Sequence, residues 1–303
     1  MPIRPMTFSE RGITEPTVSL RALLSGDRPD CAGRSDITLS TYVDEILRSG
    51  FPGIRDLPER ARQIQLDSYV TRIVDRELPE NGVIVRRPAA LKSWIAAYAA
   101  ATSTDAAFNA ILDAVTAGES DKPARQTIDG YRDHLQRLFV LDPVPAWVPT
   151  FSPLKRLTQT PKHHLLDPAI AARLVGVGKA GLLRGDGMRV SNATGTWIGA
   201  LFESLVTQSV RVYAGAANAQ VGHLRTKNTE HEVDLIVEGE DRRVVAVEVK
   251  LAATITDRDV RHLHWLRDQI GDRLADSVVI TTGEFAYRRP TASWSSPLAL
   301  LGP

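Results

Sequence analysis

The sequence predicts a mixed α/β protein with a mainly helical first half and a C-terminal domain whose elements follow the order α-β-β-β-α-β. Two observations support this fold class. Apolar residues recur at helical spacing in several segments between residues 38 and 138. From about residue 195, an apolar helix pattern precedes strand-like alternation at 219–225, 231–238 and 242–251, a helix pattern at 257–270 and a buried-type strand at 277–282.

The composition is that of an ordinary globular protein. The 303 residues are enough for two domains and a sizeable core. The net charge is only +1, so any contact with nucleic acid depends on local patches rather than on an overall field. A single cysteine, Cys31, excludes an intramolecular disulfide and a cysteine zinc cage. Because no long apolar stretch and no signal-peptide core is found, we expect a cytoplasmic protein without a membrane partner.

Residues 1–90 are expected to form a helical segment. One helix begins near Thr38 and ends before the run Gly50-Phe51-Pro52-Gly53, which stops helices. Pro58 suits the first turn of the long helix that follows. Residues 1–16 show no periodicity, which is typical of a segment that needs a partner surface.

Residues 91–150 are expected to form a winged-helix-like domain. Helix patterns at 91–101, 104–117 and 123–138 precede two short strand-like runs, at 139–141 and 147–148, and the 123–138 helix would then be the helix that contacts DNA. The exposed face of that helix carries charges of both signs: Arg125, Asp129, Arg132, Asp133 and Arg137. Since a duplex-reading helix is normally more basic, the alternative is that this unit packs on neighbouring domains.

Residues 151–190 are expected to be a basic connector, in which the only acids are Asp167 and Asp186. The cations of this stretch are Lys155, Arg156, Lys162, Arg173, Lys179, Arg184 and Arg189. Residues 151–189 are therefore a candidate contact for a DNA backbone, and a solvated connecting face is the alternative. Asp167 and Pro168 suit the cap and the first position of a helix.

The run Gly176-Val177-Gly178-Lys179-Ala180-Gly181 fits the pattern G-x-G-x-x-G, but it follows a helix pattern where a dinucleotide site needs a strand. A glycine cluster that ends a helix is the better interpretation. It is not a P-loop, because Arg173 stands at the first glycine position and Ala180 replaces the Ser or Thr that contacts magnesium. We therefore expect that this chain does not bind ATP.

Residues 191–303 contain the candidate catalytic residues. Glu248 and Lys250 share one face of a strand, and an antiparallel pairing would bring Asp234 beside them. Asp234 and Glu248 offer hard oxygen ligands for Mg²⁺ or Mn²⁺, and Glu203 from the preceding helix is a third candidate ligand. Lys250 would orient or activate a water and offset charge that develops on a phosphate. Taken singly, each of these residues is also typical of a solvent-facing strand or an ordinary helix.

The order and spacing of Glu203, Asp234, Glu248 and Lys250 resemble the motif of the PD-(D/E)XK nuclease superfamily over residues 195–282. Val233 stands where that motif usually has proline. The resemblance implies a restriction-endonuclease-like domain over residues 191–303 and metal-dependent hydrolysis of phosphodiesters.

A wider set of segments resembles the C-terminal part of bacterial and archaeal AAA-type ATPases that end in a domain of unknown function. The segments are 4–8, 42–53, 131–141, 166–168, 199–203 and 232–250. In that family a P-loop core precedes a winged-helix region and a nuclease-like domain, and this chain lacks the core. The resemblance implies that residues 1–90 are the remnant of the region after such a core, and that an ATPase domain or subunit is a partner.

Together these observations predict the nuclease-like, DNA-associated C-terminal portion of an AAA-type ATPase, with metal-dependent phosphodiester hydrolysis as its activity. Two alternatives stay open. One is a non-catalytic module that interacts with or regulates an ATPase partner, which the mixed charges of the 123–138 helix favour. The other is a DNA-binding regulator that uses the winged helix.

Overall fold

The computed structural model describes residues 3–26, 29, 32–115, 125–148, 160–185, 196–227, 230–289 and 293–303. The chain divides into two compact units. The first unit contains Met1–Tyr42, Val144–Pro161 and Leu205–Pro303, and the second contains Val43–Pro143 and Lys162–Ser204. The fold is mixed α/β, as the sequence predicts. None of the helices in the described ranges combines the length and apolarity that a bilayer crossing needs.

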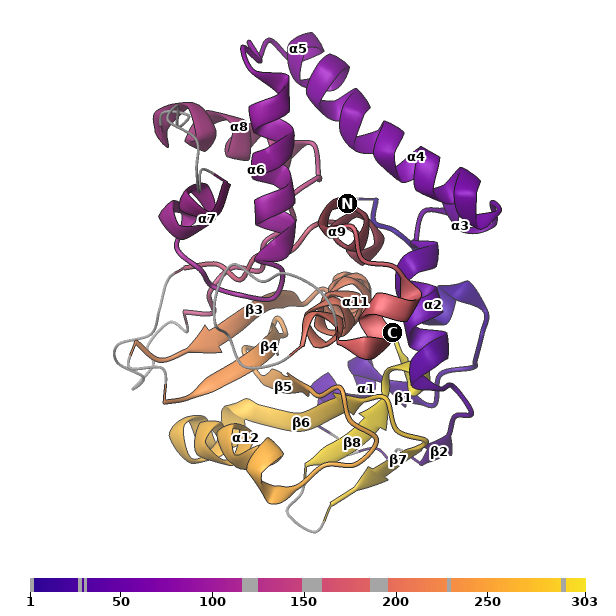
Figure 1. Ribbon diagram of the computed structural model, residues 1–303. Helices are drawn as coiled ribbons and strands as arrows, with labels where there is room; N and C mark the ends of the chain where they lie inside the picture. Colours follow the sequence, from indigo (N-terminus) through magenta and orange to yellow (C-terminus); the bar gives the residue numbers. More distant parts are fainter. Residues whose placement is uncertain are drawn as a thin grey trace. The chain divides into compact units, whose positions relative to one another are not determined.

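The first unit is built on a seven-stranded sheet with the strand order β2-β7-β8-β6-β5-β4-β3 (Figure 1). β5, β6 and β8 run parallel to one another, and the remaining neighbours are antiparallel. The strands are β2 (Gly33–Arg34), β3 (Gln220–Arg225), β4 (Glu232–Glu238), β5 (Val244–Val249), β6 (Leu274–Thr281), β7 (Phe285–Arg288) and β8 (Trp294–Pro297). The chain order α11, β3, β4, β5, α12, β6 confirms the predicted succession α-β-β-β-α-β.

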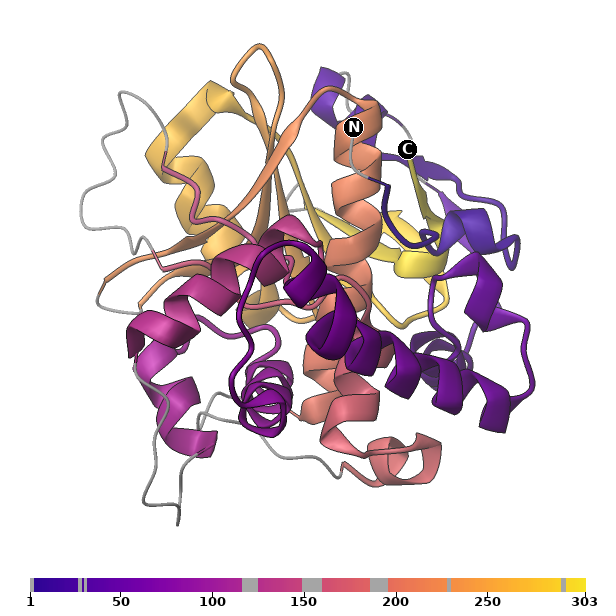
Figure 2. The ribbon, with the colours of Figure 1, turned by 90° about the horizontal axis from the view of Figure 1, so that it is seen from above.

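Two helices flank this sheet. α12 (Asp257–Ile270) covers one face, and the second half of α11 (Trp197–Ala216) lies on the opposite side (Figures 1 and 2). The apolar stripe of α12 enters a buried cluster with residues of β4, β5 and β6. The cluster includes Val260, Leu263, Leu266, Val244, Ala246 and Val279. Burial of each valine or leucine side chain in this cluster stabilises the fold by about 1.5 to 3 kcal/mol.

Residues near the N-terminus belong to this first unit. β1 (Val18–Ser19) pairs in parallel with β9 (Leu301–Gly302), and β2 pairs with β7 at the edge of the large sheet. α1 (Leu20–Ser25) lies between them in sequence, and Phe8 is fully buried. The sequence predicts only a helical segment here, because two-residue strands are too short to show a period of two.

The second unit is helical. Its helices are α3 (Pro52–Arg55), α4 (Glu59–Arg72), α5 (Leu78–Glu80), α6 (Pro88–Ala100), α7 (Phe108–Val115), α8 (Arg125–Arg137), α9 (Pro168–Val175) and α10 (Lys179–Arg184). α2 (Leu39–Arg48) crosses the boundary of the two units, a π-helix (Ile73–Glu77) joins α4 to α5, and 3-10 turns occur at Ser9–Arg11, Gly271–Arg273 and Leu298–Leu300. Pro58 is the residue that precedes α4 rather than its first residue.

The prediction of a hairpin in the winged helix is wrong, because no such hairpin forms among the described residues. The runs at 139–141 and 147–148 do not pair with each other, because Leu141 bridges to Leu165 and Ala146 bridges to His223. Phe139 has a φ of 56°, and the prolines at 143 and 145 have no N–H to donate to a ladder. A winged-helix DNA-binding regulator therefore loses the element that would make its wing.

The glycine run at residue 176 ends one helix and begins another, as the sequence predicts. Gly176 has a φ of 76° after the end of α9, where the left-handed conformation lets its N–H reach the Ala172 carbonyl. Gly178 precedes α10. Asp167 caps α9 through an N–H of Ala169, with Pro168 at the first position, which is also as predicted.

Candidate functional site

The antiparallel pairing of β4 and β5 brings Asp234 and Glu248 to one place on the sheet. Leu235 pairs with Val247 and Ile236 with Ala246, so the same register continued by one residue sets Asp234 opposite Glu248. Residues opposite each other on antiparallel strands project to the same face. Both carboxylates are largely buried, with exposed fractions of 8% for Asp234 and 5% for Glu248.

Hydrogen bonds fix both carboxylates at the end of β5. The backbone N–H of Val249 donates to Asp234 Oδ2 at 2.9 Å, so this side chain takes the place of a backbone acceptor. The ammonium of Lys250 donates to Glu248 Oε1 at 2.7 Å. The structure therefore brings together three of the predicted residues, Asp234, Glu248 and Lys250.

The electrostatics of Lys250 follow from this arrangement. Burial alone would lower its pKa, but the carboxylates of Glu248 and Asp234 act in the opposite direction and raise the pKa above its usual value. The side chain of Lys250 is one-third exposed, so its ammonium reaches solvent as well as the carboxylates. A protonated lysine in this position donates hydrogen bonds to an anion or a water, and it does not accept a proton.

Glu203 lies in α11 in the second unit, where its Oε1 accepts a hydrogen bond from Lys162 at 2.9 Å. Lys162 is 2% exposed, so this is an ion pair of a deeply buried ammonium. Among the described residues, no group of three or more His, Cys, Asp or Glu side chains is placed to hold a metal ion. The role of Glu203 as a third metal ligand stays a prediction.

Asp234 and Glu248 offer the type of oxygen ligand that a hard divalent cation prefers. Mg²⁺ prefers oxygen ligands and commonly retains several waters, so one or two protein carboxylates are a usual donor set. Two carboxylates on one sheet face, with a lysine beside them, match that chemistry. Mn²⁺ suits the same ligands.

α12 adds groups to this site that the sequence did not single out. Asp259 accepts from the N–H and the hydroxyl of Thr256 in a capping box. Burial alone would raise the pKa of Asp259, but the hydrogen bonds from Thr256 and the charges of Lys250 and Arg258 outweigh it and lower the pKa below its usual value. Burial, Arg261, His231 and Lys250 lower the pKa of His262. The Thr256-to-Asp259 spacing is a capping signal that sequence reasoning could have used.

The predicted DNA contact at 151–189 lies partly outside the described residues, which omit 151–159 and 186–190. Three of its described cations form ion pairs within the second unit: Lys162 with Glu203, Arg173 with Asp67 and Lys179 with Asp44. In α8, part of the predicted 123–138 helix, Arg132 pairs with Asp129 and Asp133. DNA binding by these segments stays a prediction.

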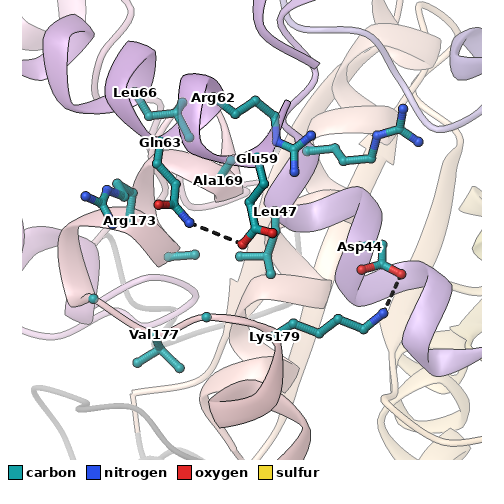
Figure 3. A pocket seen from close by; sticks show the side chains of 14 residues that line it. Asp44, Leu47, Glu59, Arg62, Gln63, Leu66, Ala169, Arg173, Val177 and Lys179 are labelled. Atoms are coloured by element: carbon teal, nitrogen blue, oxygen red, sulfur yellow. Dashed lines mark hydrogen bonds and ion pairs between the residues drawn. The ribbon is translucent and has the colours of Figure 1, made fainter. Parts of the chain in front are cut away.

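A cavity of about 390 Å³ lies within the second unit among α2, α4, α9 and the run from Gly176 to Lys179 (Figure 3). Its wall includes the apolar side chains Leu47 and Leu66. At the rim, Lys179 pairs with Asp44 at 2.6 Å, and Gln63 donates to Glu59 at 3.3 Å (Figure 3). Because these polar groups already bind one another, the cavity resembles a gap between packed helices more than a phosphate-binding site.

Two segments of the chain match domains that are known from other proteins. Residues 198–301 match a domain of unknown function, DUF4143, and residues 39–181 match a second domain of unknown function, DUF8612. The first match contains Asp234, Glu248 and Lys250, and also Glu203. No curated protein and no solved structure matches the chain.

Proposed function

We propose that this protein is the nuclease-like portion of an AAA-type ATPase system and hydrolyses phosphodiester bonds of DNA at the site formed by Asp234, Glu248 and Lys250. The observation that carries the proposal is the convergence of these residues at the ends of β4 and β5. Domains of the DUF4143 kind are common in proteins associated with AAA-type ATPases, which supports the ATPase part of the proposal.

Each residue has a distinct task in this proposal. Asp234 and Glu248 would hold Mg²⁺ or Mn²⁺. A bound cation of this kind supplies Lewis-acid polarisation of the phosphoryl oxygen and lowers the pKa of a coordinated water. Lys250 donates a hydrogen bond to a phosphoryl oxygen, which stabilises the negative charge that develops there. The hydrogen bond from Val249 holds the Asp234 carboxylate in place before substrate arrives.

The test is hydrolysis of labelled single-stranded, duplex and branched DNA by the purified chain, with Mg²⁺ or Mn²⁺ and with EDTA as the metal-free control. We expect cleavage that requires the metal and falls at least about 100-fold in Asp234→Asn and in Lys250→Met, because the first removes a metal ligand and the second removes the donor to the phosphoryl oxygen. Asp268→Asn, on the exposed side of α12, is the matched control and should retain activity.

Thermal melting of every variant separates lost chemistry from lost folding. If Asp234→Asn does not fold, Lys250→Met still tests the proposal, because that side chain is partly exposed. Absence of cleavage with all substrates, or equal cleavage by wild type and the folded variants, would contradict the proposal.

The competing function is a non-catalytic module for an ATPase partner. A specific observation favours it. Asp234 accepts a hydrogen bond from the backbone N–H of Val249 at the end of β5, and Glu248 pairs with Lys250, so both carboxylates already have structural roles. This function predicts no heat of Mn²⁺ binding by calorimetry, but association with an ATPase domain supplied in trans. The nuclease proposal predicts the heat of binding, and Asp234→Asn should abolish it.

A further inference from the structure

Three aromatic rings lie together where β4 begins. The imidazole of His231 lies flat on the indole of Trp265 from α12, with ring centroids 4.1 Å apart and planes tilted by 7°. The ring of His262 meets His231 edge-on at 5.6 Å, and their Nδ1 atoms are 3.4 Å apart. All three side chains are partly buried. We name this group, His231, His262 and Trp265, the aromatic platform.

The aromatic platform adjoins the candidate nuclease site. His231 precedes Asp234 by three residues at the start of β4, and β4 starts at the end of the sheet where β5 finishes, since the two strands are antiparallel. The positive charge of Lys250 is one of the causes that lower the pKa of His262, after burial, Arg261 and His231. The platform and the carboxylates therefore lie at one end of one sheet.

Two contacts hold the platform in place. Trp265 packs against the buried cluster beneath α12. Arg261 donates from Nε to His262 Nε2 at 3.0 Å, which fixes the orientation of that ring. A rigid stack of rings loses little conformational entropy when another flat ring joins it.

The charge around the platform is mixed. Lys227, Arg258 and Arg261 are exposed cations of the same strand ends and helix, but Glu230 and Asp257 are exposed acids there. Attraction of phosphates alone is therefore weak at this place. Recognition would rest instead on ring stacking, which contributes about 1 to 3 kcal/mol per base in single-strand-binding proteins.

From these observations we infer that the aromatic platform stacks unpaired bases, so that the substrate of the adjacent site is a single strand or an unpaired end. In a duplex the faces of the bases are covered by their neighbours, whereas a single strand offers them to side chains such as histidine and tryptophan. This inference rests on the proposed function for the identity of the ligand as DNA, and it names the form of DNA that the site takes.

Fluorescence anisotropy in EDTA measures the binding without hydrolysis. The probes are a labelled thymidine tract of about 15 nucleotides, an abasic tract of equal length, and a blunt duplex. A tract of about 15 nucleotides covers the usual site sizes of single-strand-binding proteins. We expect the thymidine tract to bind at least about tenfold more tightly than the other two, which corresponds to about 1.4 kcal/mol. An abasic tract or a duplex that binds as tightly as the thymidine tract would overturn the inference.

Variants locate the effect on the platform. His231→Ala should weaken binding of the thymidine tract to the level of the abasic tract, and His231→Phe, which restores a flat ring, should recover most of the loss. His134→Ala, in the second unit, is the matched control and should bind as wild type does. A folded His231→Ala protein with undiminished binding would refute the assignment.

The two proposals fail separately. Binding is measured without metal, and hydrolysis is measured with it. Base-dependent binding with no hydrolysis would contradict the proposed nuclease activity and support base stacking on the aromatic platform. Hydrolysis of blunt duplex with no base-dependent binding would support the nuclease activity and contradict the base stacking.

Discussion

The carboxylate of Asp167 illustrates how single buried residues organise the second unit. It is fully buried and accepts from the Ser49 hydroxyl at 2.8 Å and from the N–H groups of Gly50 and Ala169 at 2.7 and 2.8 Å. It thereby joins the turn after α2 to the start of α9. These three donors compensate the carboxyl group for the water that it loses on burial.

Replacement of Asp167 by Ala should lower the free energy of unfolding by about 3 to 5 kcal/mol, because it leaves buried donors without an acceptor. Urea denaturation followed by circular dichroism measures the change. Asp44→Ala is the control, because its ion pair with Lys179 is about half exposed and should contribute less than about 1 kcal/mol. Equal losses in the two variants would show that burial of Asp167 is not the cause.

At the scale of elements, a neighbouring segment lies so close to β3 that one position of this strand, residue 222, accommodates only glycine. Trp147 donates its backbone N–H to His223 at 2.7 Å and its indole N–H to Glu238 at 2.7 Å. A Cβ on Gly222 would lie 2.9 Å from the Cβ of Trp147 and 3.1 Å from its backbone. Only glycine therefore lets the segment from Val144 to Trp147 lie against β3.

Gly222→Ala should destabilise the first unit by about 1 to 3 kcal/mol, because the added methyl pushes Trp147 out of its contacts. The shift of the thermal midpoint measures this effect. Gly215→Ala, in α11 of the same unit, has open space around its Cβ and should leave the midpoint unchanged or slightly higher. A Gly222→Ala midpoint equal to that of wild type would contradict the close approach.

The elements that sequence reasoning predicted are those with strong periodicity. The alternating valines predict β5, and the apolar stripe with a period of 3.6 residues predicts α12. The same alternation in β5 places Glu248 and Lys250 on one face. The hairpin at 139–148 failed because its apolar runs find partners elsewhere in the chain. The ion pair of Glu203 with Lys162 and the stack of His231 on Trp265 join residues distant in sequence, so no local pattern indicates them.

At the scale of the whole molecule, the sheet depends on residues far from the segment that matches DUF4143. Residues 198–301 hold β3 to β8, but β2 and the partner strand of β9 come from the first 34 residues. Backbone bonds such as Thr17 N–H to the Leu300 carbonyl at 2.9 Å continue this connection. The matched segment therefore does not contain all the strands of the two sheets.

Residues 196–303 expressed alone should aggregate or lack cooperative unfolding, because the edges of β7 and β9 and the surface under Leu20 and Leu23 become exposed. Gel filtration and the dispersion of amide NMR signals measure the outcome. The same fragment with residues 3–42 fused through a flexible Gly/Ser linker is the control and should be better folded. A well-dispersed spectrum from the shorter fragment would disprove the dependence.

The pairing of β1 with β9 joins residues that are made at very different times during synthesis of the chain. Ser19 pairs with Gly302, so the first strand leaves the ribosome long before its partner exists. At about 5 to 20 residues per second, that interval lasts roughly 15 to 60 s. During this interval, Val43–Pro143 and Lys162–Ser204 can complete the second unit, while the partner strand of β1 has not yet been made. A chaperone would therefore have more time to act on residues 3–42 than on the later segments of the first unit.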